Sequence, residues 1–182
     1  MTKYQAEFIE NRNSSQYRVF DLVEPNSKVL EFGPAHGILT KPLKEQKNCV
    51  IDIIEISEEY GKEAAEYART ALTGKKEGDI ERYFWCDRFA GEKYDYIIFA
   101  DVLEHLFDPK EVLKKSREFL AKSGEIIVSV PNVANDAIMI NLYNNLFCYT
   151  QEGLLDNTHI RFLAMKNIPL MADELEMGIS YF

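Results

Sequence analysis

A short segment after an apolar run carries the residues best suited to bind a small charged ligand. Residues 31–37, with the sequence EFGPAHG, place Glu31 two positions before Gly33 and end on Gly37. Two glycines around a strand-to-helix turn let the backbone approach a ligand closely. A carboxylate at Glu31 would repel a pyrophosphate and attract an ammonium group. The segment therefore favours a nucleoside that carries an amino acid over a dinucleotide, whose fingerprint G-x-G-x-x-G is interrupted here by Ala35.

Polar residues also follow three later segments of the chain. Glu55 comes directly after residues 49–54, CVIDII, and its carboxylate could accept hydrogen bonds from both hydroxyls of a ribose. That role alone does not separate a dinucleotide from an amino-acid-bearing nucleoside. Asp79 could accept from an adenine amino group while Ile80 packs on the ring, and residues 100–105, ADVLEH, would line the amino-acid end.

Composition limits the classes of protein and partner. The 182 residues suit one compact domain, and a net charge of −9 argues against nucleic acid as the main partner. No apolar run approaches the roughly 20 residues of a membrane span. The first seven residues, MTKYQAE, lack the apolar core of a secretory signal, so we expect a cytoplasmic protein. Three scattered cysteines without a CxxC pair predict reduced thiols rather than a disulfide framework or a zinc site.

Strand and helix patterns alternate along the chain. Apolar runs between turn signals predict a parallel sheet covered on both faces, a Rossmann-like, mostly parallel, doubly wound α/β fold. The expected strands span residues 28–32, 49–54, 72–78, 94–100 and 125–130, and the expected helices lie within residues 4–23, 37–47, 57–71 and 108–121. The third strand is the weakest prediction, because residues 73–77, TGKKE, are polar. Ligands of such sheets bind beyond the carboxyl ends of the strands, where the polar residues above fall.

These motifs, in this order, resemble the class I S-adenosylmethionine-dependent methyltransferases (EC 2.1.1.-). Residues 29–37 resemble the family's first motif, Glu55 its ribose acid, residues 78–80 its adenine motif and residues 100–106 the segment after its fourth strand. The resemblance implies S-adenosylmethionine as the cofactor and S-adenosylhomocysteine as the product. The residues that it implies in contact with the cofactor are Glu31, Gly33, Pro34, Ala35, Gly37, Glu55, Ile56, Asp79, Ile80, Ala100, Asp101 and Leu103.

A narrower similarity concerns the acceptor. Residues 129–135 and 149–162 resemble bacterial methyltransferases that are found beside glycosyltransferases in glycan and O-antigen biosynthesis. This implies a small-molecule acceptor that is sugar-like or lipid-linked. His159 and His105 are the candidate catalytic residues, because a histidine titrates near neutral pH. We expect His159 to act as general base or acceptor contact and His105 to face the methyl donor. Each also has a structural alternative, His159 as a hydrogen-bonding residue and His105 as a packed residue at a helix start.

Three expectations concern metal, domain limits and function. We expect no metal site, because Asp101 and Glu104 without a third ligand are typical of a solvated helix start. A single domain spans residues 1–182, with a helical segment at 1–27, a cofactor-binding core at 28–130 and an acceptor-side segment at 131–182. The family's sheet ends in an antiparallel hairpin for which only residues 178–182 remain, so we expect an incomplete hairpin in a chain that is truncated before the last strand or cut from a longer protein. The expected partner is a second copy in a homodimer or a missing C-terminal segment. A non-catalytic methyltransferase-like binding module and a nicotinamide-dependent oxidoreductase are the alternative functions.

Overall fold

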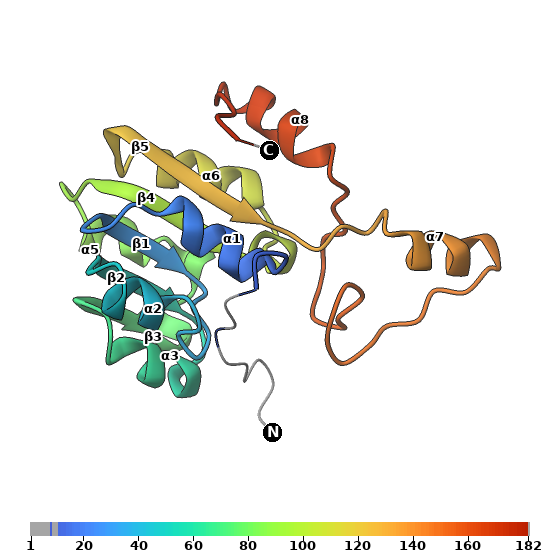
Figure 1. Cartoon of the computed structure of the whole chain (residues 1–182), viewed down its shortest axis with the longest axis horizontal. Coiled ribbons are helices and arrows are strands. Elements are labelled where there is room, and N and C mark those ends of the chain that lie inside the picture. Colours follow the sequence, from blue (N-terminus) through green and yellow to red (C-terminus); the bar gives the residue numbers. More distant parts are fainter. Residues whose placement is uncertain (1–7, 9–10, 182) are drawn as a thin grey trace.

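Five parallel strands form a single sheet in the computed structural model, which describes residue 8 and residues 11–181 (Figure 1). The strand order is β3-β2-β1-β4-β5, and every pairing between neighbours is parallel. The strands are β1 (Lys28–Phe32), β2 (Val50–Glu55), β3 (Thr70–Thr73), β4 (Tyr94–Ala100) and β5 (Leu120–Ser129). The order reverses between β1 and β4, which is where ligands of such sheets bind. The predicted Rossmann-like α/β class is confirmed.

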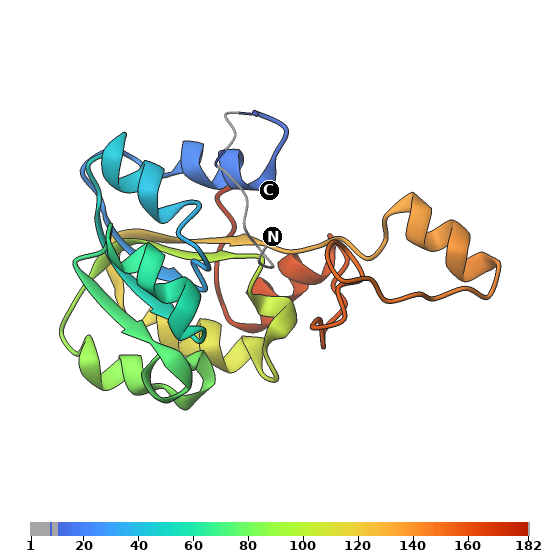
Figure 2. The same cartoon turned by 90° about the horizontal axis from the view of Figure 1, so that it is seen from below.

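Helices cover both faces of the sheet because neighbouring strand residues point to opposite sides. Val29 packs into one apolar layer and Leu30 into the other. The first layer includes side chains of α1 (Ser15–Leu22), α2 (Thr40–Glu45) and α3 (Glu58–Ala65). The second includes side chains of α5 (Phe84–Arg88), α6 (Pro109–Arg117) and α8 (Asn167–Glu174). Figure 2 shows the sheet nearly edge-on, with α1 and α2 on one side and α6 on the other.

Side chains at helix starts explain where several helices begin. The hydroxyl of Ser57 accepts a hydrogen bond from the backbone N–H of Tyr60 at 3.2 Å, which confirms the predicted cap of α3. Asp108 caps α6 in the same way through the N–H of Glu111 at 3.1 Å, and Pro109 occupies the first turn, where its missing N–H costs nothing. These local signals fix the connections that carry the site residues.

The structure differs from the sequence-based expectation in three places. The third strand ends at Thr73, earlier than predicted, because residues 74–77 form the short helix α4 (Gly74–Glu77). The fifth strand begins at Leu120, five positions before its predicted start. The predicted N-terminal helix is shorter than expected, because α1 begins at Ser15 and residues 8 and 11–14 are not helical; residues 4–7 and 9–10 lie outside the described residues. Residues 178–181, the described part of the segment left for the incomplete hairpin, contain no strand.

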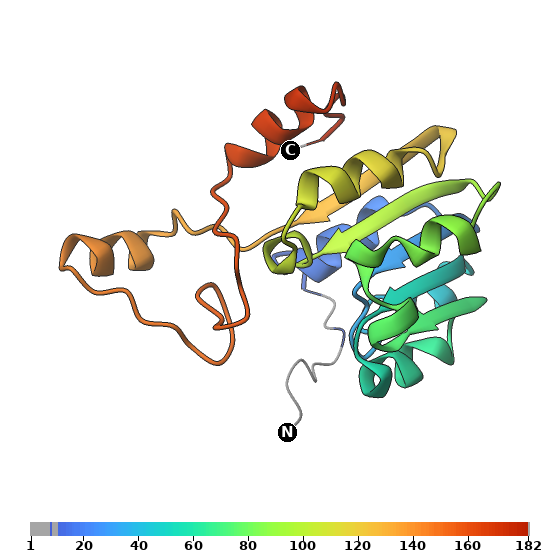
Figure 3. The ribbon, with the colours of Figure 1, turned by 180° about the vertical axis from the view of Figure 1, so that it is seen from behind.

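The chain leaves the sheet after β5 as an extended arm and then returns (Figures 1 and 3). The arm carries α7 (Asp136–Tyr143), whose apolar side chains are largely exposed, Tyr143 at 89%. The chain comes back to the domain as α8, where Met171 is buried in the second layer. No helix within residues 8 and 11–181 combines the length and the apolar character that a membrane crossing needs.

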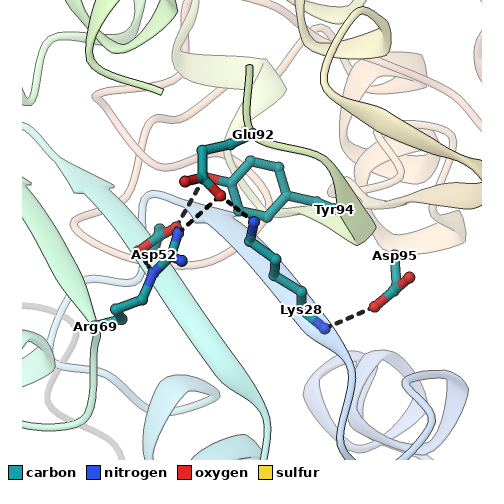
Figure 4. A network of polar contacts seen from close by, with 6 residues as sticks. All are labelled: Lys28, Asp52, Arg69, Glu92, Tyr94 and Asp95. Atoms are coloured by element: carbon teal, nitrogen blue, oxygen red, sulfur yellow. Dashed lines mark hydrogen bonds and ion pairs between the residues drawn. The ribbon is translucent and has the colours of Figure 1, made fainter. Parts of the chain in front are cut away.

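A buried carboxylate in the middle of the sheet is held by a polar network (Figure 4). The side chain of Asp52 in β2 is fully buried. The Tyr94 hydroxyl donates to its Oδ2 atom at 2.8 Å, and Arg69 donates Nε–H to Oδ1 at 3.0 Å and also contacts Oδ2. Arg69 also reaches Glu92 at 3.2 Å, and Glu92 pairs with Lys28. The fold itself therefore supplies hydrogen-bond partners to both oxygens of the Asp52 carboxylate, from Arg69 and Tyr94.

Replacing Arg69 by Met should destabilise the protein, because the buried Asp52 carboxylate would lose its cation. Breaking one side of a buried ion pair is costly, but Arg69 is itself 41% exposed, so we expect a loss of about 2 kcal/mol in unfolding free energy. Lys62→Met, which removes an exposed pair with Glu58, is the matched control and should change stability by less than about 0.5 kcal/mol. Equal stabilities of the two variants in urea denaturation would contradict this role of Arg69.

Candidate functional site

The carboxyl ends of three strands meet at one edge of the sheet. Phe32 pairs in register with Ile54 of β2 and with Phe99 of β4. The residues that follow these strands are therefore neighbours in space. The N–H of Gly33 confirms this by donating to the carbonyl of Ile54 at 2.8 Å. The predicted cofactor residues after β1, β2 and β4 thus lie along a common edge.

The glycine turn after β1 packs against the segment after β4. Gly33, Ala35 and Gly37 all have positive φ, at 64°, 48° and 79°. A Cβ atom added to Gly33 would lie 2.7 Å from Cγ2 of Val102, so a larger residue would push the two segments apart. Pro34 within the turn is buried. The left-handed backbone and the close approach together explain why glycine is needed at position 33.

Glu31 presents a buried carboxylate at this edge. Glu31 is only 2% exposed. The hydroxyl of Thr40, at the start of α2, donates a hydrogen bond to its Oε2 atom at 2.8 Å. Burial raises the pKa of Glu31 to about 7, and the nearby Glu55 charge adds to this effect. Among the described residues, Glu31 forms no ion pair with a lysine, arginine or histidine. A cationic ligand group at this position would compensate the burial of the carboxylate.

Glu55 connects the glycine turn to the start of α3. Its Oε2 atom accepts the N–H of Ala35 at 2.9 Å, and Oε1 accepts the N–H of Ser57 at 2.8 Å. Burial raises the pKa of Glu55, and these two hydrogen bonds oppose that effect. Each carboxylate oxygen has a second lone pair, so both can still accept from a ligand hydroxyl. Ile56 follows with 54% of its surface exposed, so its side chain is accessible at this edge.

The predicted adenine motif lies beside Glu55 although β3 ends earlier than expected. A Cβ atom on Gly78 would lie 1.9 Å from the backbone oxygen of Glu55, so only glycine allows this approach. Asp79 caps the following 3₁₀ helix, η1 (Ile80–Arg82), by accepting from the N–H of Glu81 at 3.1 Å. Ile80 is 9% exposed and belongs to the second apolar layer. Asp79 and Ile80 are thus held next to Glu55, the residue predicted to bind the ribose.

The segment after β4 combines exposed and buried residues. Asp101, at φ 56°, accepts from the Ser129 hydroxyl at 3.0 Å, and burial raises the pKa of its carboxyl group. Ala100 is half-buried. Leu103 is completely buried in the second layer, so only its backbone faces the edge. Glu104 is 1% exposed within η2 (Leu103–His105), so the expectation of a solvated helix start is wrong.

The two candidate catalytic histidines lie together. The rings of His105 and His159 are 4.8 Å apart at their centroids and packed edge to face. His159 is 8% exposed. The contact arises because the chain beyond the arm folds back onto η2, where the N–H groups of Ile160 and Arg161 both donate to the carbonyl of Glu104 at 3.0 Å. The structure therefore unites two histidines that are far apart in sequence.

Sequence reasoning missed Thr40, which carries no motif and whose hydroxyl donates to Glu31. Val102 and Asp156 lie within the segments that carry the family resemblance, but their packing roles arise from contacts between distant segments. His36 lies inside the glycine turn, and its Nδ1 atom is 3.0 Å from Oε1 of Glu63 while its ring packs on Tyr60 of α3.

Two surface cavities lie outside the edge formed by the strand ends. One of about 410 Å³ is lined by Arg12, Tyr17, Arg18, Asp21 and Tyr181. One of about 380 Å³ is lined by Phe107, Asp108, Pro109, Lys110, Arg161, Leu163 and Met171.

Known proteins share this architecture. A protein family described as a methyltransferase domain matches residues 6–174. A SAM-dependent methyltransferase from Archaeoglobus fulgidus is 18% identical with a TM-score of 0.66, over 87% of this chain and 64% of that protein. A SAM-dependent methyltransferase of Thermotoga maritima, described as a possible histamine N-methyltransferase, is 18% identical with a TM-score of 0.62. The match covers 88% of this chain and 69% of that protein.

A third similar structure contains the product of methyl transfer. The plantazolicin methyltransferase BpumL in complex with SAH is 19% identical with a TM-score of 0.61, over 88% of this chain and 60% of that protein. At these identities the likeness establishes the fold alone. The chain spans 64% of the length of the Archaeoglobus protein and 60% of BpumL. No curated protein sequence matches the chain.

The protonation of Glu31 should make stability depend on pH. Its pKa is about 7 in the folded protein, against an ordinary value of 4.5, so the folded state holds the proton more tightly. The stabilisation is therefore complete below about pH 4.5 and is lost as the pH rises through about 7. Wild type should lose about 3 kcal/mol more than Glu31→Gln across this window in urea denaturation. Parallel pH profiles of the two proteins would contradict a raised pKa at Glu31.

Gly78→Ala should disturb the contact between the loop at residues 78–80 and Glu55 of β2. The added Cβ atom meets a backbone oxygen, which cannot rotate away, so we expect a loss of at least about 2 kcal/mol in unfolding free energy. Gly178→Ala is the matched control, because nothing lies within 4 Å of a Cβ at that position. If both variants unfold at the wild-type urea concentration, the loop does not depend on this close approach.

Proposed function

Because the chain belongs to the methyltransferase domain family, we propose that it transfers a methyl group from S-adenosylmethionine to a small-molecule acceptor. One observation carries the proposal. The buried carboxylate of Glu31 precedes the glycine turn in the chain, and that of Glu55, close enough to influence the pKa of Glu31, accepts the N–H of Ala35 within the turn at 2.9 Å. Carboxylates so placed suit the ammonium group and the ribose of an adenosyl amino acid. Membership of this family also favours methyl transfer over the nicotinamide alternative.

The residues at the strand ends fit this cofactor. When bound, it supplies an electrophilic methyl carbon on a positively charged sulfonium. Glu31 would pair with the ammonium group, and Glu55 would accept from the ribose hydroxyls. Gly33 packs against Val102 without a side chain between them, and the backbone of the glycine turn would face the ligand. The occurrence of SAH in the similar BpumL structure supports the same ligand class.

The acceptor end lies at Asp101, His105 and His159. These residues follow β4 or fold back onto it, next to the glycine turn that would hold the amino-acid end. Alignment of an acceptor atom with the methyl carbon can supply much of the rate enhancement, because it converts a bimolecular reaction into an effectively unimolecular one. We propose that His105 and His159 act on the acceptor's reacting atom, by contact or by handling its proton.

We further propose a sugar-like or lipid-linked acceptor. The segments that resemble glycan-associated enzymes include residues 149–162, which contribute to an aromatic cluster of Phe147, Tyr149 and Phe162. These three side chains are 40%, 56% and 36% exposed. Exposed aromatic faces can cover the apolar face of a sugar ring while the ring hydroxyls stay in water. The cluster lies on the acceptor-side segment, beyond the cofactor-binding core.

Calorimetric titration with S-adenosylhomocysteine tests the cofactor. The wild-type chain should bind one equivalent, and Glu31→Gln and Glu55→Gln should each weaken binding by at least about tenfold, because each loses a charge-assisted contact. Glu59→Gln is the matched control, an exposed carboxylate in the first turn of α3, and should bind as wild type does. Absence of heat and of a thermal shift at saturating ligand would refute the proposal.

A screen with methyl-labelled cofactor tests the acceptor class. Sugar nucleotides and lipid-linked sugars should take up label, and small amines should not. Phe162→Ala should lower the apparent acceptor affinity by roughly tenfold, with unchanged binding of S-adenosylhomocysteine. Labelling of amines alone would contradict the sugar-like class. Cofactor binding without any labelled product would favour the non-catalytic binding module.

A further inference from the structure

A cluster of three side chains at the acceptor end has the composition of a cation site. Glu104, His105 and His159 each offer a ligand atom, and these atoms lie within 4.8 Å of one another. The chain contains only three histidines, and two of them meet here. We propose that these three residues bind a divalent transition-metal ion. The ion would be a ligand additional to the cofactor, at a site that the sequence did not predict.

The state of Glu104 is the strongest argument for a missing positive charge. The residue is 1% exposed, and within residues 8 and 11–181 neither of its carboxylate oxygens has a hydrogen-bond partner. No lysine or arginine of that described part pairs with it; the nearest ion-pair atom is Nε2 of His159, at 3.9 Å from Oε1. Buried carboxylates are normally hydrogen-bonded, paired with a cation or bound to a metal. A metal ion between Glu104 and the two histidines would compensate the burial of this carboxylate.

The hydrogen bonds of the two histidines fix which nitrogen can bind an ion. Nδ1 of His105 lies 3.2 Å from the carbonyl of Thr158, and Nδ1 of His159 lies 3.3 Å from the carbonyl of Leu154. A carbonyl oxygen only accepts, so each Nδ1 carries the proton of the neutral ring. The lone pair is then on Nε2 in both rings. Metal-binding histidines are commonly oriented by this kind of backbone contact.

The separations suit a small ion after a modest closure. Two ligand atoms of a tetrahedral zinc ion lie about 3.4 Å apart, given bonds of about 2.0–2.1 Å. Oε1 of Glu104 and Nε2 of His159 are 3.9 Å apart. Closing the ligand atoms, which are at most 4.8 Å apart, to about 3.4 Å would bring the cluster to bonding distance. Two imidazoles and one carboxylate favour zinc, iron or a similar transition metal over magnesium or calcium.

Outer contacts hold the cluster in place. Oδ1 of Asp156, a residue 1% exposed, accepts from the N–H of Thr158 at 2.8 Å and from its hydroxyl at 2.7 Å. This turn presents the Thr158 carbonyl to His105. Asp101 and Asp156 also place negative charge close to Glu104. Backbone carbonyls thus hold both histidine rings in place. The negative charges around Glu104 create an electrostatic potential that favours a cation.

The three ligands leave open positions on the ion. A cation with three protein ligands can bind a further oxygen, and a bound hydroxyl loses its proton more readily than a free one. The ion would therefore orient an acceptor hydroxyl and lower its pKa. With the ion bound, His105 and His159 would act on the acceptor through the ion, as its ligands, in place of the direct contact or proton transfer proposed above. This role of the ion rests on the proposed methyl transfer, whereas binding of the ion does not.

Titration of the metal-free chain with Zn²⁺ and Co²⁺ tests the proposal. We expect one equivalent of Zn²⁺ by calorimetry and visible absorption bands of protein-bound Co²⁺. Glu104→Gln and His159→Gln should each weaken Zn²⁺ binding by at least about 100-fold, because each removes a ligand. The matched controls are Glu111→Gln, an exposed carboxylate of α6, and His36→Gln, the third histidine; both should bind Zn²⁺ as wild type does.

Circular dichroism of every variant accompanies the titration, and His105→Asn replaces any variant that fails to fold, because His105 is only half-buried. Absence of stoichiometric Zn²⁺ binding to wild type, or unchanged affinity in the folded ligand variants, would overturn the proposal. Titration of the same samples with S-adenosylhomocysteine separates the two proposals. A chain that binds Zn²⁺ without the nucleoside contradicts only the proposed function, and the reverse result contradicts only the metal site.

Discussion

The cost of burying carboxylates organises this protein. Asp52, in the middle of β2, receives a guanidinium and a phenol hydroxyl from the fold itself. Glu31 and Glu104, at the carboxyl edge of the same sheet, have no lysine or arginine partner among the described residues, and burial raises the pKa of both. A buried carboxylate without a cation lowers stability. The carboxyl edge therefore differs from the middle of β2 in that its buried carboxylates receive no cation from the fold, and the ligands proposed above would supply one.

The sequence predicted the fold well because its strongest signals are local. Apolar runs fix the strands, and β4 (Tyr94–Ala100) has the predicted limits. The cap at Ser57 is a signal contained within four residues. The third strand was placed too late because its pairing with β2, through Asp52 and Thr70, depends on a tertiary contact that no local pattern specifies. The polar residues after Thr73, which made this strand the weakest prediction, form the short helix α4 instead.

The site was predictable where it depends on backbone shape, and less so where it depends on distant contacts. Gly33 and Gly78 carry visible motif signals, and the structure gives each a close approach that only glycine allows. Glu104 was misinterpreted because an acidic residue after a strand usually faces solvent. Its burial results from residues 160 and 161, whose N–H groups bind the Glu104 carbonyl. That contact spans more than fifty positions, and only the folded chain reveals it.

The segment from Asp101 to His105 connects the two parts of the site. Val102 fills the space beside Gly33, and therefore sets the position of the glycine turn. Leu103 anchors the same segment in the core, and Glu104 directs its carboxylate toward His159. Because these neighbours share one short 3₁₀ turn, neither part can shift without the other. The spacing between the methyl donor and the acceptor's reacting atom would then be set by packing of this turn, which is rigid because interiors are close-packed.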